Sequence, residues 1–154
     1  LARAGYEQYE IANFARKGYE CRHNLCYWQY RDYLGLGLGS HSFLAGERLV
    51  NVEDFSSYFR KVATGKRPVA VRERIDATRG MVEMVMLGLR LKQGLAAGDF
   101  FDRWQRDLSS FFSSRFEVLM VEGFVCWEGG NCRLTEKGIL ASNRVLAELL
   151  DPYL

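Results

Sequence analysis

The stretch CRHNLCYW, residues 21–28, gathers side chains that bind ligands and metals. It holds a histidine, two cysteines, an arginine and two large aromatic residues within eight positions. Such a set fits a metal site, a nucleophile, a platform for a flat ligand or an ordinary surface connection. Imidazole is a common metal ligand and the usual axial ligand of haem iron. We therefore treat this stretch as the first candidate site, and we predict that it is a loop.

His23 is the residue of this loop most suited to bind iron. Ligating histidines usually form a hydrogen bond through the second ring nitrogen, and Asn24 is placed to hold the ring in this way. Tyr27 and Trp28 offer flat apolar surfaces to a planar ligand. Arg22 could pair with a propionate.

The second candidate is DYLGLGLGSHSFLAG, residues 32–46, where leucine and glycine alternate. The alternation predicts a strand with Gly35, Gly37 and Gly39 on one face and His41 at its rim. The spacing GxGxG differs from the GxGxxG of a Rossmann nucleotide site, which we reject. Two interpretations remain, a glycine-lined surface beneath a flat ligand or a barrel strand that packs closely against its neighbours.

The four cysteines show no recognised cluster pattern. Cys21 and Cys26 are spaced CxxxxC, and Cys126 and Cys132 flank WEGGN, so neither pair has the CxxC spacing of a zinc ribbon. The sequence contains no CxxxCxxC triplet for an iron–sulfur cluster. We expect all four to be unligated, although Cys26 is the rival of His23 because a thiolate also binds haem iron.

Composition narrows the class of protein. The 154 residues are 48% hydrophobic and 26% charged, which suits a folded domain rather than a disordered chain. The net charge of +2 is too small to indicate nucleic acid binding through bulk electrostatics. No apolar run reaches the length of a membrane span, and no signal peptide is evident, so we expect a cytoplasmic protein. The opening LARAGYEQYEI reads as a helix end running into a strand, which suggests a piece of a longer protein.

The pattern of elements predicts an α+β fold in two parts. Residues 1–65 contain strands, a hairpin at LAGERLVN and a helix capped by Asn51. A basic extended segment at 66–72 marks the boundary. Residues 73–154 then give a long helix to about Gln93, a short helix after Asp99, a helix from Leu108 to Gly123, a ribbon at FVCWEGGNCRL and a helix after Thr135. Helix, helix, helix, ribbon, helix is the order of a winged-helix module.

This module is a poor match for DNA. Its candidate recognition helix, DLSSFFSSRFEVLMVEG, has Arg115 as its one basic residue, and the wing sequence EGGN has none. Contacts to phosphates need several cations on one face. We therefore expect no nucleic acid partner, and a wing that packs against another domain.

Three blocks in succession, YEIANFA, CRHNLCYW and YLGLGLGSHSF, resemble the oxygen-independent coproporphyrinogen III oxidase-like radical SAM family. In particular, the chain resembles the branch regarded as haem chaperones, whose HNxxYW motif is matched by residues 23–28. The later LGLRLKQGL and LTEKGILASNRVL resemble the C-terminal helical domain of that family. The resemblance thus covers essentially the whole chain.

The resemblance implies a role for each candidate segment. Residues 1–65 would be the last strands of a radical SAM partial (β/α) barrel with a haem-binding loop, and 73–154 a winged-helix-like accessory domain. His23 would ligate the haem iron, and the glycine-rich strand ending at His41 would line a cavity for S-adenosylmethionine and porphyrin. The family's [4Fe–4S] cluster, which reductively cleaves S-adenosylmethionine, would lie in an N-terminal half outside this chain. We therefore expect neither a cluster nor a catalytic residue here.

The implied function is the C-terminal segment of a radical SAM haem chaperone. Two alternatives remain open, which are oxidative decarboxylation of coproporphyrinogen III by the intact protein and a stand-alone winged-helix interaction module. The implied partners are haem or porphyrin, the N-terminal radical SAM half and a haem-acceptor protein. Peripheral contact with a membrane, without a span, is also left open.

Overall fold

The computed structural model describes residues 1–112 and 114–150, which form two compact units. The first unit combines Leu1–Tyr30 with the chain from Ala77 onward, and the second is Arg31–Asp76. Both units mix helices with antiparallel strands, so the predicted α+β class is confirmed. The sequence suggested one boundary between residues 65 and 73. The chain instead passes from one compact unit to the other after Tyr30 and again after Asp76. The assignment of 1–65 to a radical SAM barrel stays a prediction.

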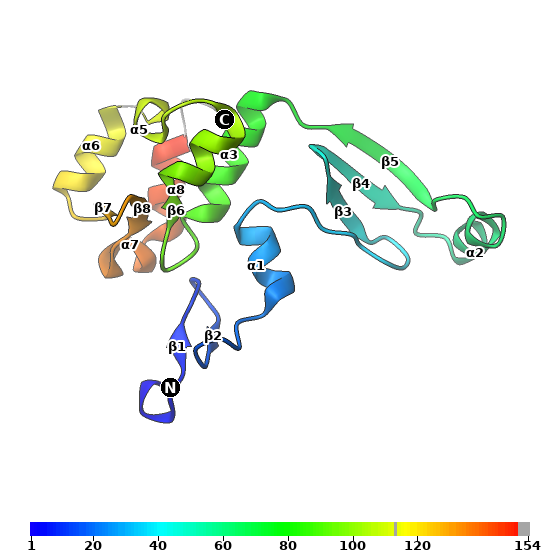
Figure 1. Ribbon diagram of the computed structural model, residues 1–154, viewed down its shortest axis with the longest axis horizontal. Helices are drawn as coiled ribbons and strands as arrows, with labels where there is room; N and C mark the ends of the chain where they lie inside the picture. The colour runs from blue at the N-terminus through cyan, green and yellow to red at the C-terminus, as the bar shows by residue number, and fades with distance from the viewer. Residues whose placement is uncertain (113, 151–154) are drawn as a thin grey trace. The chain divides into compact units, whose positions relative to one another are not determined.

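The first unit is built around helix α3 (Ala77–Gly88), shown in green in Figure 1. The buried residues of α3 are Gly80, Met81, Val82, Met84, Val85 and Gly88. Helices α1 (Arg22–Trp28), α4 (Ala97–Trp104) and α8 (Ser142–Leu150) contact it. At Gly88 a Cβ atom would lie 2.9 Å from the Leu95 side chain, so glycine allows the following strand to pass close by.

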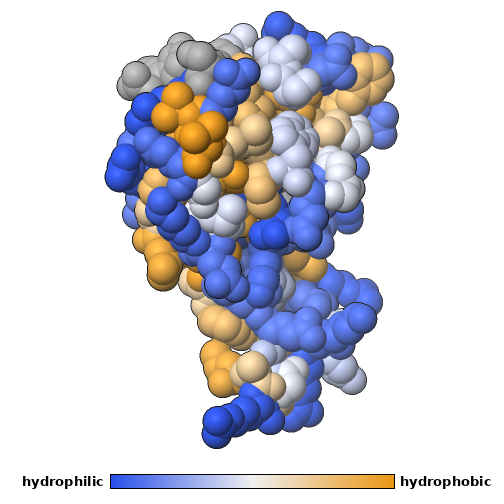
Figure 2. Space-filling view, turned by 90° about the vertical axis from the view of Figure 1, so that its left-hand side faces the viewer, coloured by the Kyte–Doolittle hydropathy of each residue, from blue (hydrophilic) through white to orange (hydrophobic). Residues whose placement is uncertain are grey.

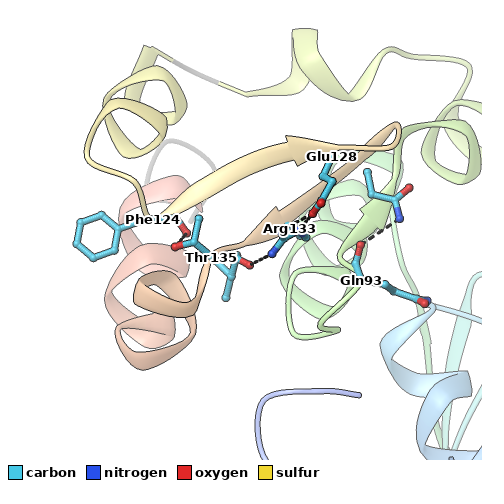
Figure 3. A network of polar contacts seen from close by, with 7 residues as sticks. Gln93, Phe124, Glu128, Arg133 and Thr135 are labelled. Carbon is cyan, nitrogen blue, oxygen red and sulfur yellow. Dashed lines mark hydrogen bonds and ion pairs between the residues drawn. The ribbon is translucent and has the colours of Figure 1, made fainter. Parts of the chain in front are cut away.

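A small antiparallel sheet, in the order β6-β8-β7, packs beside these helices. Its strands are β6 (Leu95–Ala96), β7 (Val125–Glu128) and β8 (Asn131–Leu134). The β7–β8 turn consists of Gly129 and Gly130, both with positive φ, which confirms the predicted ribbon. An ion pair of Arg133 with Glu128 holds the ribbon (Figure 3). In addition, the Asn131 amide donates to the Gln93 carbonyl at 3.0 Å.

The remaining helices of this unit complete its core. They are α5 (Leu108–Phe111), α6 (Ser114–Val121) and α7 (Glu136–Leu140). Thr135 caps α7 as predicted, because its side-chain oxygen accepts a hydrogen bond from the backbone of Gly138 at 3.1 Å. The most deeply buried side chains include Phe100, Leu108, Leu119, Leu134, Val145 and Leu149.

The N-terminal residues are tied to the end of α3. After a short 3-10 turn, η1 (Ala2–Ala4), strands β1 (Glu7–Gln8) and β2 (Phe14–Ala15) form a hairpin. Glu10, in the loop of this hairpin, forms an antiparallel bridge with Leu91. Backbone bonds flank the bridge, from Ile11 N to Arg90 O at 3.0 Å and from Lys92 N to Tyr9 O at 3.0 Å.

The second unit is a three-stranded antiparallel sheet, in the order β3-β4-β5, with one helix. Its elements are β3 (His41–Leu44), β4 (Glu47–Asn51), α2 (Phe55–Ala63) and β5 (Val69–Arg74). The β3–β4 hairpin turns at Ala45 and Gly46, both with positive φ, as the sequence LAGERLVN predicted. Asp54, rather than Asn51, caps α2, since its carboxylate accepts from Ser57 N at 2.6 Å.

Figure 2 shows a face of the molecule that is mostly hydrophilic, with separate apolar patches. The most exposed apolar side chains of the first unit include Val121, which is 90% exposed, and Leu140, which is 91% exposed. Within the described residues, none of the helices has the length and apolar character needed to cross a membrane.

Several element boundaries differ from the prediction for local reasons. The long helix expected over 73–93 is α3 alone, because residues 69–74 pair with β4 and the chain turns after Gly88. The single helix expected from Leu108 to Gly123 is divided into α5 and α6. The short strand β6 was not predicted, because two residues are too few to show a period.

Glycine at position 94 is required by both conformation and space. Gly94 has a φ of 77°, and a Cβ atom there would overlap the carbonyl oxygen of Cys132. Gly123 has a similar φ of 74°, with nothing within 4 Å of its Cβ position. Gly123→Ala should therefore lower the free energy of unfolding by about 1–2 kcal/mol through backbone strain. Gly94→Ala should lower it by about 1–3 kcal/mol more, through the added overlap. Urea denaturation of both variants measures the difference, and equal losses would contradict the close approach of β8.

Candidate functional site

Residues 22–28 form a helix, so the predicted loop at this position is wrong. Helix α1 begins at Arg22 after Cys21, whose backbone is extended, and Leu25 N donates to Cys21 O at 2.9 Å. The stretch contains no glycine or proline to oppose a helix. Tyr30, with a φ of 51°, ends this part of the chain in a tight turn.

One side of α1 is fixed to the end of α3. The Arg90 guanidinium lies over the Trp28 indole, with its central carbon 4.9 Å from the ring centroid. The Trp28 Nε1 and Arg90 Nε atoms are buried and have no hydrogen-bond partner among the described residues. Contact between the two side chains therefore anchors α1 by stacking and packing.

The turn after α1 is held by Tyr30, which is 4% exposed. Its hydroxyl donates to the Glu83 carboxylate at 3.4 Å, and its carbonyl accepts from Arg103 Nη1 at 3.1 Å. The Arg103 guanidinium also lies 4.7 Å above the Tyr30 ring. Helices α3 and α4 thus both fix the chain where α1 ends.

The outer side of α1 carries His23. His23 is exposed, and its Nε2 atom lies 2.8 Å from the Tyr27 hydroxyl, one helical turn away. The two rings meet edge to face, with centroids 4.8 Å apart. Asn24, expected to hold the imidazole, instead donates from its amide to the Tyr9 hydroxyl at 3.1 Å. Tyr27 is thus the residue that holds the ring, while Asn24 fastens the helix to the N-terminal segment.

The cysteines nearest His23 differ in access. Cys21 is exposed, Cys26 is half-buried on α1, and neither forms a disulfide. The part of the chain that the structure describes contains no group of three His, Cys, Asp or Glu side chains that could hold a metal ion. A haem iron needs only one or two axial ligands from the protein, so a single side chain such as His23 would be enough to hold it.

The glycine-rich segment is a loop, so the strand predicted over residues 32–40 is wrong. Strand β3 begins only at His41, and Gly37 and Gly39 have φ values of 102° and 60°. These two glycines therefore serve turns, not one face of a strand. At Gly35, a Cβ atom would overlap the His41 carbonyl oxygen. The expected close approach to a glycine backbone is thus found, but the approaching group is the chain itself.

A cavity of about 470 Å³ opens on the second unit. Its apolar lining comes from Leu34, Leu36, Leu44, Leu49, Val62 and Val69. Gly35 and Ser42 also line it, whereas His41 does not. His41 is exposed, and alternation along β3 sets it opposite to Ser42 and Leu44. Its expected approach to S-adenosylmethionine stays a prediction.

Tyr9, Tyr30 and Arg90 position α1, and sequence reasoning missed all three. Arg90 lies in LGLRLKQGL, which was noted for its resemblance and not for a contact with Trp28. An arginine directly after an apolar helix was the available signal, because arginine stacks on aromatic rings. Nothing in the sequence indicated that Tyr9 would meet Asn24.

Comparisons with known proteins show what this chain is similar to. Residues 75–141 match the model of the HemN C-terminal domain. Over these residues the chain is similar to the HemN C-terminal domain. The resemblance to coproporphyrinogen oxidase-like radical SAM proteins is confirmed.

The curated relatives extend the match to almost the whole chain. Proteins named haem chaperone HemW are 50% identical in Haemophilus influenzae and 33% identical in Bacillus subtilis, each over 95% of this chain. The relative in Mycobacterium tuberculosis is 33% identical over 97% of the chain. The chain spans 38%, 38% and 36% of these three relatives, so each of them is much longer.

A solved structure shows the same fold. The coproporphyrinogen III oxidase HemN from Escherichia coli, described as a radical SAM enzyme, aligns with a TM-score of 0.69 and 17% identity. The alignment covers 100% of this chain and 39% of that protein. At this identity the likeness concerns the fold.

The four thiols should react at different rates. Burial, and to a lesser degree nearby Cys126, raises the pKa of the Cys132 thiol from 9.0 to about 12. Cys132 therefore stays protonated and unreactive in the folded protein at pH 8–10, whereas exposed Cys21 should be alkylated readily. Mass-spectrometric mapping of iodoacetamide labelling, with an unfolded control in which all four react, measures this order.

The same pKa shift has a consequence for stability. Because the folded-state pKa is raised, Cys132 favours the folded state fully below about pH 9 and loses this contribution as the pH rises toward about 12. Rapid labelling of Cys132 in the native protein at pH 8 would contradict its burial.

Proposed function

We propose that this chain is the C-terminal segment of a radical SAM haem chaperone and that α1 binds haem through His23. The observation that carries the proposal is the exposed imidazole of His23, on a helix whose other side is anchored by Trp28 and Asn24. Similarity to proteins named haem chaperones over almost the whole chain supports it.

The surroundings of His23 suit a flat, dianionic ligand. Arg22 is exposed beside His23 at the start of α1 and could pair with a haem propionate. Tyr27 is half-buried and presents its ring next to the imidazole. Trp28 is covered on one face by Arg90, so its proposed contact with the macrocycle would use another part of the indole. Cys26 remains the competing ligand on the same helix.

We also propose that the full-length protein binds S-adenosylmethionine and a [4Fe–4S] cluster. The triplet of cysteines that would hold the cluster has no counterpart in this chain, so an N-terminal half would have to supply it. The cluster would provide the electron that cleaves S-adenosylmethionine. From this chain, Gly35, Gly37, Gly39 and His41 would contribute to the cavity for S-adenosylmethionine or porphyrin.

The C-terminal elements follow the order helix, strand, helices and ribbon, from α3 to β8. We propose that they form a winged-helix-like domain that contacts another domain or a haem-acceptor protein in the cytoplasm. The net charge of +2 for the chain gives no support to a nucleic acid partner. The oxidase reaction is the alternative for the intact protein, and the HNxxYW motif is the reason for preferring the chaperone.

Replacing His23 should abolish stable haem retention by the full-length protein. His23→Ala should lower haem affinity by at least about ten-fold, because even residues that only orient a metal ligand contribute that much. Cys26→Ser should retain most of the haem. Titration of haem followed by the Soret absorption measures both.

Tyr19→Ala is the control, since it removes an aromatic side chain that is 82% exposed and lies outside α1. It should leave haem binding unchanged. If Cys26→Ser abolished retention while His23→Ala did not, the ligand would be sulfur. If neither variant lost haem, α1 would have no part in binding.

A further inference from the structure

Helix α1 contains a hydrogen bond that uses a ring nitrogen of the proposed haem ligand. The Tyr27 hydroxyl and His23 Nε2 are 2.8 Å apart, and the two residues are neighbours on one face of the helix. No long-range rearrangement is needed to form or break this bond, because both groups belong to the same turn. The bond is also at the surface, where the side chains can turn toward water.

The hydrogen bond and an iron–nitrogen bond would use the same electrons. In the imidazole tautomer with its proton on Nδ1, the lone pair of Nε2 accepts the Tyr27 O–H. Iron binds a neutral imidazole through that same kind of lone pair. The two interactions at Nε2 are therefore mutually exclusive.

We infer that Tyr27 is an internal competitor of haem iron for His23 Nε2 and that it promotes haem release. This inference rests on the proposed function, since it takes His23 as the haem ligand. When iron binds, the Tyr27 O–H···N bond breaks and the hydroxyl turns to water. When iron leaves, the hydroxyl restores the bond and the vacated lone pair is occupied again.

The size of the effect suits a protein that passes its ligand on. The net contribution of one hydrogen bond corresponds to about a five-fold change in an equilibrium constant. A competitor of that strength weakens the hold on haem without preventing binding. Tyr27 is positioned to act in this way because α1 is anchored elsewhere, by Trp28 against Arg90 and by Asn24 against Tyr9. Loss of the Tyr27 hydroxyl should therefore leave the helix in place.

The test measures haem transfer from the full-length protein to excess apomyoglobin, and haem binding to the apo protein, by stopped-flow absorption. Tyr27→Phe keeps the ring and removes the hydroxyl, so it should raise the haem affinity, the ratio of the association to the dissociation rate constant, about five-fold relative to wild type. The near-ultraviolet circular dichroism of the apo protein should be unchanged. Tyr19→Phe, which removes a hydroxyl from a tyrosine that is 82% exposed, should dissociate like the wild type.

The outcomes separate this inference from the proposed function. An equal or lower haem affinity for Tyr27→Phe would overturn the competition and assign Tyr27 a supporting role, such as orienting the ring while iron binds the other nitrogen. If His23→Ala dissociates at the wild-type rate in the same assay, the proposed function fails, whatever Tyr27→Phe does.

Discussion

The arrangement of α1 depends on the short segment that follows α3. Arg90 contributes twice, since its carbonyl accepts a hydrogen bond from Ile11 and its guanidinium covers Trp28. Leu91 is 4% exposed and pairs with Glu10, which is 2% exposed. Residues 9–11 and α1, which precede Arg90 by more than sixty positions, are thereby attached to the C-terminal helical core. The contacts of this one turn after α3 thus determine which side of α1 is buried, and His23 is left exposed.

This attachment uses only part of the seven residues of the helix. Trp28 and Asn24 hold α1 in place through Arg90 and Tyr9, whereas His23 and Tyr27 are bonded to each other at its surface. A ligand at His23 would therefore meet a helix that is already positioned, which reduces the ordering cost of binding. A protein that only stores haem would benefit from the tightest ligation at this position. The proposed transfer of haem needs an exposed ligand and a bond that can be replaced, and the pair His23–Tyr27 would supply both.

The sequence predicted best where local chemistry alone decides the structure. The ribbon around Gly129 and Gly130, the Thr135 cap and the hairpin at Ala45–Gly46 follow from turn and capping preferences, and all three are confirmed. Helix α1 was not predicted, because its seven residues are too few to show a helical period of apolar side chains. Its stability comes from contacts with Arg90 and Tyr9.

The prediction of a strand in the glycine-rich segment was wrong for a different reason. Alternating leucine and glycine over residues 34–39 imitates a strand, but positive φ at Gly37 and Gly39 shows that these glycines serve turns. For the site, residue types were identifiable from sequence, whereas their partners were not. Tyr27, rather than Asn24, meets the imidazole, because residues four apart lie on one face of a helix. Asn24 instead bonds to Tyr9.

The central claim is that an imidazole nitrogen of His23 binds iron, and pulsed electron paramagnetic resonance tests it most directly. The full-length protein would be prepared with ¹⁵N-labelled histidine and loaded with ferric haem. The account predicts a ¹⁵N hyperfine coupling from an axial imidazole in the wild type and its loss in His23→Ala. A spectrum without that coupling, or one that is unchanged in His23→Ala, would contradict it.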